Sequence, residues 1–357
     1  MQADVQTLLD GELGSWLEGQ QAMREEAKKK AWNRWFIGGC ALLPALAFLW
    51  FLPLSLGDFK FFISAIAVGG VYAWGYAPIS EAKKAVKIGI NSAIAADLGI
   101  SYDHDLEPGD EYEACKTYGL VPSCHRDSFE DRWHGELEGH PFNLYEAHLE
   151  ERRGSGKNRR WVTVFRGAII DIGFGRPFHS TTLLQRKGKH KKWLGFGGRK
   201  DHVDFKGHRL DFVDQVHPDF EDVFEVWSDD QVEARVLVHP SYVEHLLSLE
   251  RAFNGDAVRA LFRAGEVVIA IESGNMFESG SMKAEEDHAR VAEAAEQFAA
   301  MARLATAINQ NERGRVIAKE VERDRGADAT PPISETAREA ARNDPARPAG
   351  GFGRKGL

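Results

Sequence analysis

Two apolar runs near the N-terminus decide the fold: residues 35–52 read WFIGGCALLPALAFLWFL, and residues 61–80 read FFISAIAVGGVYAWGYAPIS. Neither run contains a charged residue. Each is close to the roughly 20 apolar residues that a helix needs to cross a bilayer. Lipid offers the backbone no hydrogen-bond partners, so a segment inside it must be helical. Because only Pro53 to Lys60 separate the runs, the sequence predicts an antiparallel transmembrane hairpin over residues 35–80.

Basic residues are concentrated at the two outer ends of the hairpin. The connector has one basic residue, Lys60. The outer ends carry Arg24, Lys28, Lys29, Lys30 and Arg34 before the first run and Lys83, Lys84 and Lys87 after the second. The positive-inside rule therefore predicts two passes with both termini in the cytoplasm. A cleaved signal peptide is the competing interpretation of the first run, but that run is too long and a second one follows it.

Small residues recur at every fourth position of the second run, namely Ala65, Gly69, Ala73 and Ala77. Such a stripe lets another helix approach closely. Packing within the hairpin is the preferred interpretation, and a seam with a second copy or another membrane protein is the alternative.

The rest of the chain has the patterns of an α+β domain with a mostly antiparallel sheet and flanking helices. Strand-like runs with a turn near Gly139 and another at Ala264-Gly265 predict hairpins. A capping box at Ser241 and Glu244 predicts a helix start, and residues 282–308 have helical periodicity. The predicted organisation is an amphipathic helix (1–34), the transmembrane hairpin (35–80), a helical stalk and connector with a short helix near 114–118 (81–130), a cytoplasmic α+β domain (131–310) and a disordered tail (311–357).

Composition excludes some classes of function. The formal net charge is −9, which argues against nucleic acid as a partner, because nucleic-acid binding needs a broad basic surface. The three cysteines, Cys40, Cys115 and Cys124, are too few for a disulfide scaffold and are expected to be reduced thiols.

Three phrases carry a family resemblance: HGELEGHPFNLYEAHLEER from His134, VFRGAIIDIGFGRPF near Phe165, and DFEDVFEVWSDDQVEARVLVHPSYVEHLLSL from Asp219. With the helical hairpin, they resemble an uncharacterised bacterial membrane-protein family, domain of unknown function 3137. The resemblance covers most of the chain up to about Ile308 and implies a location in the bacterial inner membrane. It implies no activity and assigns no catalytic residue.

Basic loops are the most unusual feature of the domain. Residues 152–160 read RRGSGKNRR and residues 186–200 read RKGKHKKWLGFGGRK, without an acid in either. Beside a membrane, such a loop would contact anionic lipid headgroups or phosphate, although most charge runs are simply solvated. The candidate contact residues are Arg186, Lys187, Lys189, Lys191, Lys192, Trp193, Arg199 and Lys200.

Two groups have metal-ligand residue types. His202, Asp204 and His208 would share a face of one strand, with Asp211 pointing away, and Cys115, Cys124 and His125 lack a tight chelating pair such as C-x2-C. Polar residues on a solvent-facing strand explain the first group equally well, and a structural role fits the second, so we expect no metal and no cofactor. There is also no nucleophile elbow and no phosphate-binding glycine loop.

These observations favour a protein without catalytic activity that presents a cytoplasmic binding or scaffold domain at the membrane. Its expected partners are the bilayer, anionic headgroups and another protein. The alternatives are a membrane-bound enzyme acting on a lipid-linked or phosphorylated substrate, and a structural subunit of a membrane complex.

Overall fold

The computed structural model describes residues 11–51, 57–137, 139–174, 178–187, 201–214, 223–274, 276 and 281–306. The chain divides into two units, Met1–Asn309 and Gln310–Leu357, and all of the described residues belong to the first. The predicted tail, 311–357, lies outside the described residues.

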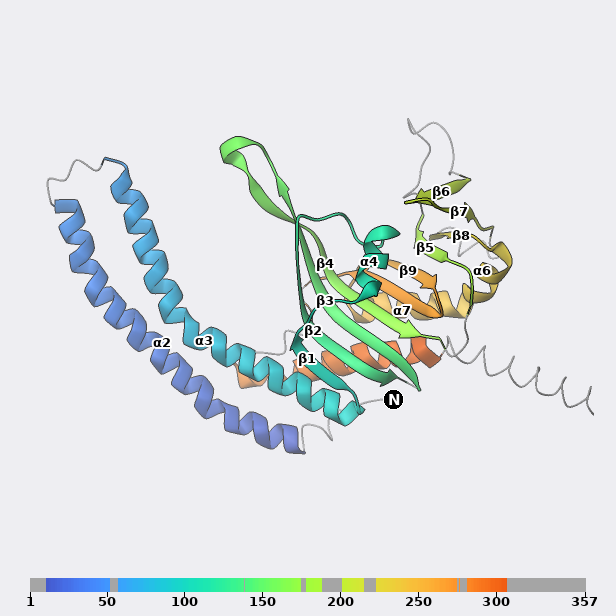
Figure 1. The fold of residues 1–357 in the computed structure, drawn as a ribbon. Coiled ribbons are helices and arrows are strands. Elements are labelled where there is room, and N and C mark those ends of the chain that lie inside the picture. Colours follow the sequence, from blue (N-terminus) through green and yellow to red (C-terminus); the bar gives the residue numbers. More distant parts are fainter. Residues whose placement is uncertain are drawn as a thin grey trace, which may run out of the picture. The chain divides into compact units, whose positions relative to one another are not determined.

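Two helices of 40 residues each dominate the N-terminal part, α2 (Glu12–Phe51) and α3 (Phe59–Leu98) (Figure 1). Each helix joins an apolar run to a more polar segment without a break. In α2 the polar segment comes before the run, and in α3 it comes after the run. Pro44 and Pro78 are accommodated inside them. Gly99, with a φ of +70°, ends α3 in the left-handed conformation that glycine adopts most readily.

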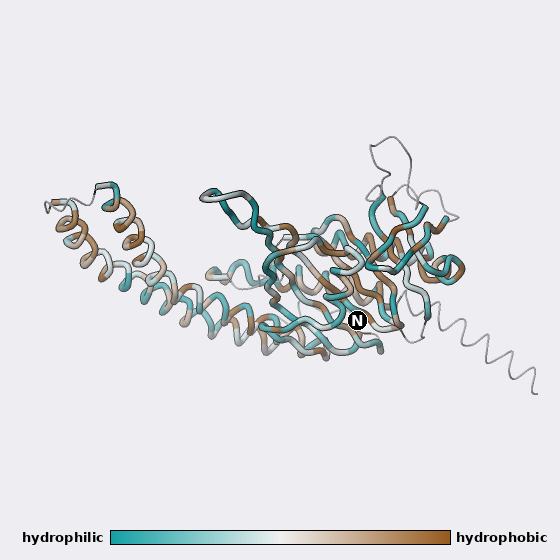
Figure 2. Tube along the Cα trace, turned by 45° about the horizontal axis from the view of Figure 1, so that its top comes forward, coloured by the Kyte–Doolittle hydropathy of each residue, from teal (hydrophilic) through white to brown (hydrophobic). Residues whose placement is uncertain are grey.

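The apolar runs are long and apolar enough to cross a membrane, and only 6% and 11% of their most apolar windows are buried. Their large side chains are therefore exposed, including Phe36, Leu43, Phe48, Phe62 and Ile66. We call the part of the helix pair that contains the two apolar runs the apolar half, and the rest of α2 and α3 the polar half. Figure 2 shows the apolar half next to the connector, with the polar half beyond it. A core helix of a water-soluble protein would instead bury such residues.

Ten strands of the described residues form one antiparallel sheet in the order β1-β2-β3-β4-β10-β9-β5-β8-β7-β6. The strands are β1 (Ser101–Asp105), β2 (Arg126–Leu137), β3 (His140–Arg153), β4 (Arg160–Gly173), β5 (Thr182–Arg186), β6 (His202–Phe205), β7 (His208–Phe212), β8 (Phe224–Ser228), β9 (Asp256–Arg263) and β10 (Glu266–Glu272). The predicted α+β class with an antiparallel sheet is confirmed.

Local turn chemistry explains the hairpins. β9 and β10 are joined by Ala264 and Gly265, with φ values of +54° and +86°, and β6 and β7 by Lys206 and Gly207, with +52° and +88°. Two successive positive φ values match the twist of the flanking strands.

Helices cover both faces of the sheet. One face packs against α3, α7 (Pro240–Ala252) and the helix of residues 287–306, with α6 (Gln231–Leu237) at its margin. The other face packs against α4 (Asp110–Thr117). Because neighbouring strand residues point to opposite faces, Leu144 and Ile170 belong to the first core and Tyr145 and Ile169 to the second.

Some local predictions were wrong. The predicted connector contains β1, and its short helix is α4, which begins four residues earlier and ends one residue earlier than predicted. Ser241 is not the cap of α7: the side chain of His239 accepts from the N–H of Tyr242, with Pro240 at the first turn. His202 and Asp204 lie on β6 and His208 and Asp211 on β7, so a tight turn at Lys206-Gly207 replaces the single predicted strand.

Candidate functional site

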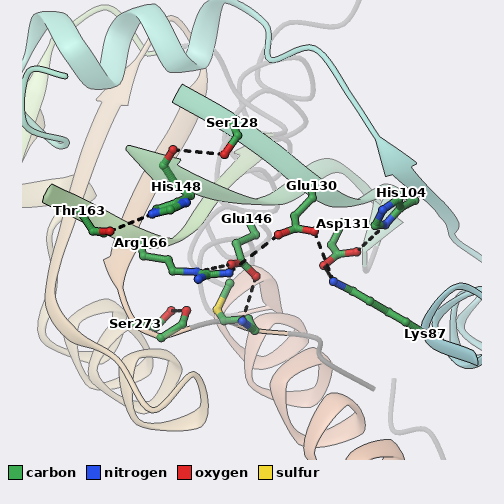
Figure 3. A network of polar contacts seen from close by, with 12 residues as sticks. Lys87, His104, Ser128, Glu130, Asp131, Glu146, His148, Thr163, Arg166 and Ser273 are labelled. Carbon is green, nitrogen blue, oxygen red and sulfur yellow. Dashed lines mark hydrogen bonds and ion pairs between the residues drawn. The ribbon is translucent and has the colours of Figure 1, made fainter. Parts of the chain in front are cut away.

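A buried polar junction joins α3 to the sheet (Figure 3). The Lys87 ammonium lies 2.6 Å from Asp131 Oδ2 and 3.5 Å from Glu130 Oε2. The side chains of Lys87 and Asp131 are 6% and 0% exposed. The hydroxyl of Tyr102 donates to Asp131 Oδ1 at 2.6 Å, and Nδ1 of His104 lies 3.3 Å from the same atom. Asp131 therefore collects three polar groups from α3 and β1.

A β-bulge aims Asp131 into this position. The register between β2 and β3 shifts between Glu130 and Trp133, and Asp131 has a φ of +60°. A bulge turns a side chain that would otherwise follow the alternation of the strand, and aspartate tolerates the left-handed region better than most residues. Burial raises the pKa of Asp131, whereas Lys87 and Tyr102 act to lower it.

A second carboxylate extends the junction along the sheet. Glu146 on β3 is 1% exposed, accepts from Arg166 Nε at 3.0 Å and from the backbone N–H of Met276 at 2.9 Å. Arg166 also lies 3.9 Å from Glu130, which links the two halves (Figure 3). Burial raises the pKa of Glu146 to about 7, although both hydrogen bonds oppose the shift.

Ligand atoms of His104, Glu130 and Asp131 lie within 4.8 Å of one another, a group that could hold a metal ion. The ammonium of Lys87, however, already lies against both carboxylates and supplies the positive charge. As folded, the group is an ion pair joining a helix to a sheet, and the sequence analysis missed it because its members come from three separate segments.

A second buried ion pair fixes the other long helix. Arg24 of α2 binds both carboxylate oxygens of Asp287 at 2.9 Å, with side chains 2% and 5% exposed. Asp287 begins the described helix of residues 287–306. Leu13 and Leu17 of α2 also share a core with Ile90 and Ile94 of α3. The polar half of the helix pair is thus an integral part of the domain.

The other face of the sheet carries acidic groups below α4. Burial raises the pKa of Asp171 to about 7, and Glu266 and Glu111 raise it further. Cys115 is fully buried, and burial raises the pKa of its thiol above its ordinary value. Such a thiol is not a nucleophile at neutral pH. A surface hollow of about 400 Å³ lies beside α4, lined by Asp110, Glu113, Ala114, Thr117, Tyr118, Lys206, His208 and Arg263.

The basic loop of residues 186–200 is described only at its start. Arg186 forms an ion pair with Glu250 and lies over the ring of Phe224 at 4.7 Å, and Lys187 donates its backbone N–H to Val223. Both belong to the packed domain. The remaining candidates, Lys189, Lys191, Lys192, Trp193, Arg199 and Lys200, lie outside the described residues.

The small-residue stripe faces away from α2. Ala65, Gly69 and Ala73 are exposed, Ala77 is half-buried, and no atom lies within 4 Å of the Cβ position at Gly69. The helices instead approach at Gly38 beside Val71 and at Gly75 beside Trp35. In the structure, positions two residues farther along α3 than Gly69 and Ala73, namely Val71 and Gly75, make these contacts with α2.

The β6–β7 hairpin places the histidines and aspartates that were considered for metal. His202 lies opposite Asp211, so these two share a face, contrary to the prediction that Asp211 points away, and Asp204 lies opposite Arg209. Cys115 and Cys124 are free thiols, and Cys124 Sγ lies 3.7 Å from the hydroxyl of Tyr112.

The fold and its junction define an antiparallel α+β domain carried on two long helices with apolar ends. Residues 163–310 match the family model described as "Protein of unknown function (DUF3137)", which confirms the predicted resemblance over this part of the chain. The phrase from His134 and the helical hairpin lie outside the matched residues. A solved structure, the crystal structure of the mycobacterial trehalose monomycolate transport factor A, TtfA, matches with 13% identity over 59% of this chain and 93% of that chain, at a TM-score of 0.29. No curated protein matches.

Proposed function

We propose that the chain is an integral protein of the bacterial inner membrane that holds a cytoplasmic binding or scaffold domain in a fixed orientation at the bilayer. The observation that carries this proposal is the continuity of α3. Its first half exposes Ile66 and Val68, whereas its second half buries Ile90 and Ile94 in the core of the sheet. A helix that is lipid-exposed at one end and core at the other transmits orientation without a flexible linker.

Aromatic residues at both ends of the apolar half support a membrane location. Near the polar half, the Arg34 guanidinium lies 5.6 Å from the Trp74 ring centre, and Trp35 Nε1 donates to the Tyr72 carbonyl. At the connector end, Trp50 Nε1 donates to Ser64 Oγ and its ring meets Phe61. Indole and phenol rings concentrate at membrane–water interfaces, because one part is apolar and the other is polar.

Buried ion pairs support a fixed domain over a loosely tethered one. Lys87–Asp131 and Arg24–Asp287 tie both helices to the sheet domain. Truncating one partner of such a pair leaves a buried charge, which costs about 3–5 kcal/mol. The geometry is thus suited to presenting a surface to a partner at a defined height.

The test is a topology measurement on the full chain in a background lacking Cys40 and Cys124, with buried Cys115 retained. We expect Asp58→Cys in the connector to react with an impermeant maleimide in intact spheroplasts. Val232→Cys, on the exposed surface of α6, should react only after permeabilisation. Release of the chain by carbonate would refute membrane insertion, and the reversed labelling pattern would refute the orientation.

A second candidate, a structural subunit of a membrane complex, is favoured by the exposure of the small-residue stripe. Gly69→Cys places a thiol in the middle of the stripe, and the matched control Val68→Cys lies one position around the helix. If the stripe is a seam, oxidation gives a dimer or partner adduct at Gly69→Cys in clear excess over Val68→Cys. Equal yields at the two positions would contradict a seam.

A further inference from the structure

A two-stranded ribbon extends from the sheet at the β3–β4 hairpin. β2 begins opposite Glu150, and β10 ends opposite Gly167, whereas β3 and β4 pair with each other as far as Arg153 and Arg160. The last part of the hairpin therefore has no neighbouring strand among the described residues. Figure 1 shows it projecting beyond the other strands. We call residues 152–160 the hairpin tip.

The hairpin tip concentrates positive charge at some cost to its own stability. Its nine residues include five basic ones and no acid. Arg153 and Arg160 lie directly opposite each other in the register, and like charges in cross-strand pairs destabilise a hairpin. The Glu151 carboxylate offsets part of this repulsion, because it lies 2.8 Å from Arg153 Nε. Arg152, Arg159 and Arg160 are exposed, and no ion pair joins them to an acid among the described residues. A bound anion would relieve this repulsion.

An exposed aromatic residue lies beside these charges. Trp161 is 43% exposed and pairs across the ribbon with Arg152. The guanidinium of Arg126 stacks 4.3 Å from the centre of its ring. Guanidinium groups bind phosphate oxygens in a bidentate manner, and tryptophan favours the headgroup region. The combination matches an anionic lipid surface.

The contacts of α3 show in which direction the hairpin tip points. Ile100, just after α3, lies against Gly135, whereas Lys87, 13 residues earlier, lies against Asp131. The direction along α3 toward its apolar run is therefore the direction along β2 toward Arg126. Because β3 is antiparallel to β2, β3 runs in this same direction to the hairpin tip. Figures 1 and 2 agree that the tip lies on the side of the apolar half of the helices.

The lengths are sufficient for contact with the bilayer. From Lys87 to the end of the apolar run at Ser80, α3 rises about 10 Å, at about 1.5 Å per residue. From Glu146, which is paired with Glu130, to Arg153 the strand covers about 23 Å, at about 3.3 Å per residue. Even with a substantial tilt between strand and helix, the hairpin tip reaches the level of the headgroups.

We propose that the hairpin tip binds anionic lipid headgroups of the bilayer that α2 and α3 cross, giving the domain a second contact with the membrane. This inference rests on the proposed function. The contact would fix the rotation of the domain about the helix pair, and it would depend on the anionic lipid content of the membrane.

The test uses the full chain reconstituted into vesicles of phosphatidylcholine alone or mixed with phosphatidylglycerol. A fluorophore on Ser155→Cys reports proximity to lipids that carry a nitroxide on the headgroup, again without Cys40 and Cys124. We expect quenching to rise about fivefold when phosphatidylglycerol is added. This factor corresponds to the attraction of a single basic residue to an anionic surface, so it is a lower bound for several arginines. High salt should reverse the increase, because it screens exposed charges.

Charge reversal supplies the matched control. Arg152→Glu, Arg159→Glu and Arg160→Glu together should remove the increase. Lys206→Glu, Arg209→Glu and Lys283→Glu make the same change in net charge at other exposed positions and should leave the increase in place. Equal quenching in both lipid mixtures, or an increase that survives reversal at the hairpin tip, overturns the proposal and makes the tip a solvated loop.

A second fluorophore separates this inference from the proposed function. At Ile66→Cys it should be quenched by a nitroxide on the acyl chain if α3 crosses the bilayer. Quenching at Ile66 without quenching at Ser155 refutes only the headgroup contact. Absence of quenching at both positions refutes membrane insertion as well.

Discussion

The two halves of the α2–α3 helix pair have the same backbone conformation but opposite surroundings. The half next to the connector exposes Phe48, Phe62 and Ile66, whereas the other half buries Ile90 and Ile94 against the sheet. Charge follows the reverse pattern, because the second half carries Lys87 and Arg24 in buried ion pairs. The hydropathy of an exposed helical segment therefore indicates whether lipid or water surrounds it. Contacts with other elements decide which residues of the helix are buried.

The largest expected effect comes from breaking the junction in the packed half. Lys87→Ala leaves the Asp131 carboxylate buried without its cation, so the free energy of unfolding should fall by about 3–5 kcal/mol. Thermal unfolding of the solubilised full chain measures it. Lys84→Ala, an exposed position on the same helix, should change stability by less than about 0.5 kcal/mol.

Lys87→Met combined with Asp131→Asn removes both charges and should recover most of the loss. Asparagine keeps an acceptor for Tyr102 and tolerates the positive φ of this position. If Lys87→Ala and Lys84→Ala prove equally mild, the junction does not hold the domain.

Removing a large apolar side chain should also affect the two halves of the helix pair differently, by nearly as much as breaking the junction. Ile94 is 0% exposed and Ile66 is 61% exposed. Ile94→Ala should lower the free energy of unfolding by about 2–5 kcal/mol, since the core cannot fill the space. Ile66→Ala removes a side chain that is mostly exposed and should cost less than about 1 kcal/mol. Denaturant titration in mild detergent compares them, and equal losses would contradict the assignment of core to only one half.

The junction should also make stability depend on pH. Burial raises the pKa of Glu146 from 4.5 to about 7, so between these values the folded state holds a proton that the unfolded state has lost. This contribution to stability is fully present below about pH 4.5 and is lost as pH rises to about 7, by up to about 3 kcal/mol at about 1.4 kcal/mol per pKa unit.

Glu146→Gln should flatten this fall when unfolding is measured across pH 4.5 to 7.5. Asp171, whose pKa is also raised to about 7, contributes a slope of the same sign and remains in both proteins. An unchanged slope in the variant would mean that Glu146 ionises normally.

The smallest expected difference concerns glycines. A Cβ at Gly89 would lie 2.0 Å from the ring of Trp16, whereas a Cβ at Gly69 meets nothing within 4 Å. Gly89→Ala should cost about 1–3 kcal/mol through overpacking, and Gly69→Ala should be neutral or stabilising by up to about 1 kcal/mol through helix propensity. Thermal unfolding measures both, and Trp16→Leu should relieve the cost of Gly89→Ala. A cost at Gly69 instead would show that this position is covered.

Local patterns in the sequence were enough for the apolar runs, the hairpin turns near Gly139 and at Ala264-Gly265, and the antiparallel α+β class, because alternation and turn propensity act between near neighbours. They also indicated the DUF3137 resemblance. They failed for the cap of α7, where a histidine competed with a regular capping box, and for β1, whose five residues alternate only between exposed and half-buried.

Tertiary structure alone decided the sites. Arg24 and Asp287 lie 263 positions apart in the chain, and Lys87 finds Asp131 only because a bulge turns that aspartate inward. The outward direction of Ala65, Gly69 and Ala73 and the direction of the hairpin tip likewise follow from how α3 lies against its neighbours. Sequence periodicity specifies which face of an element is apolar, but buried charge pairs form between elements, and their geometry exists only after the chain has packed.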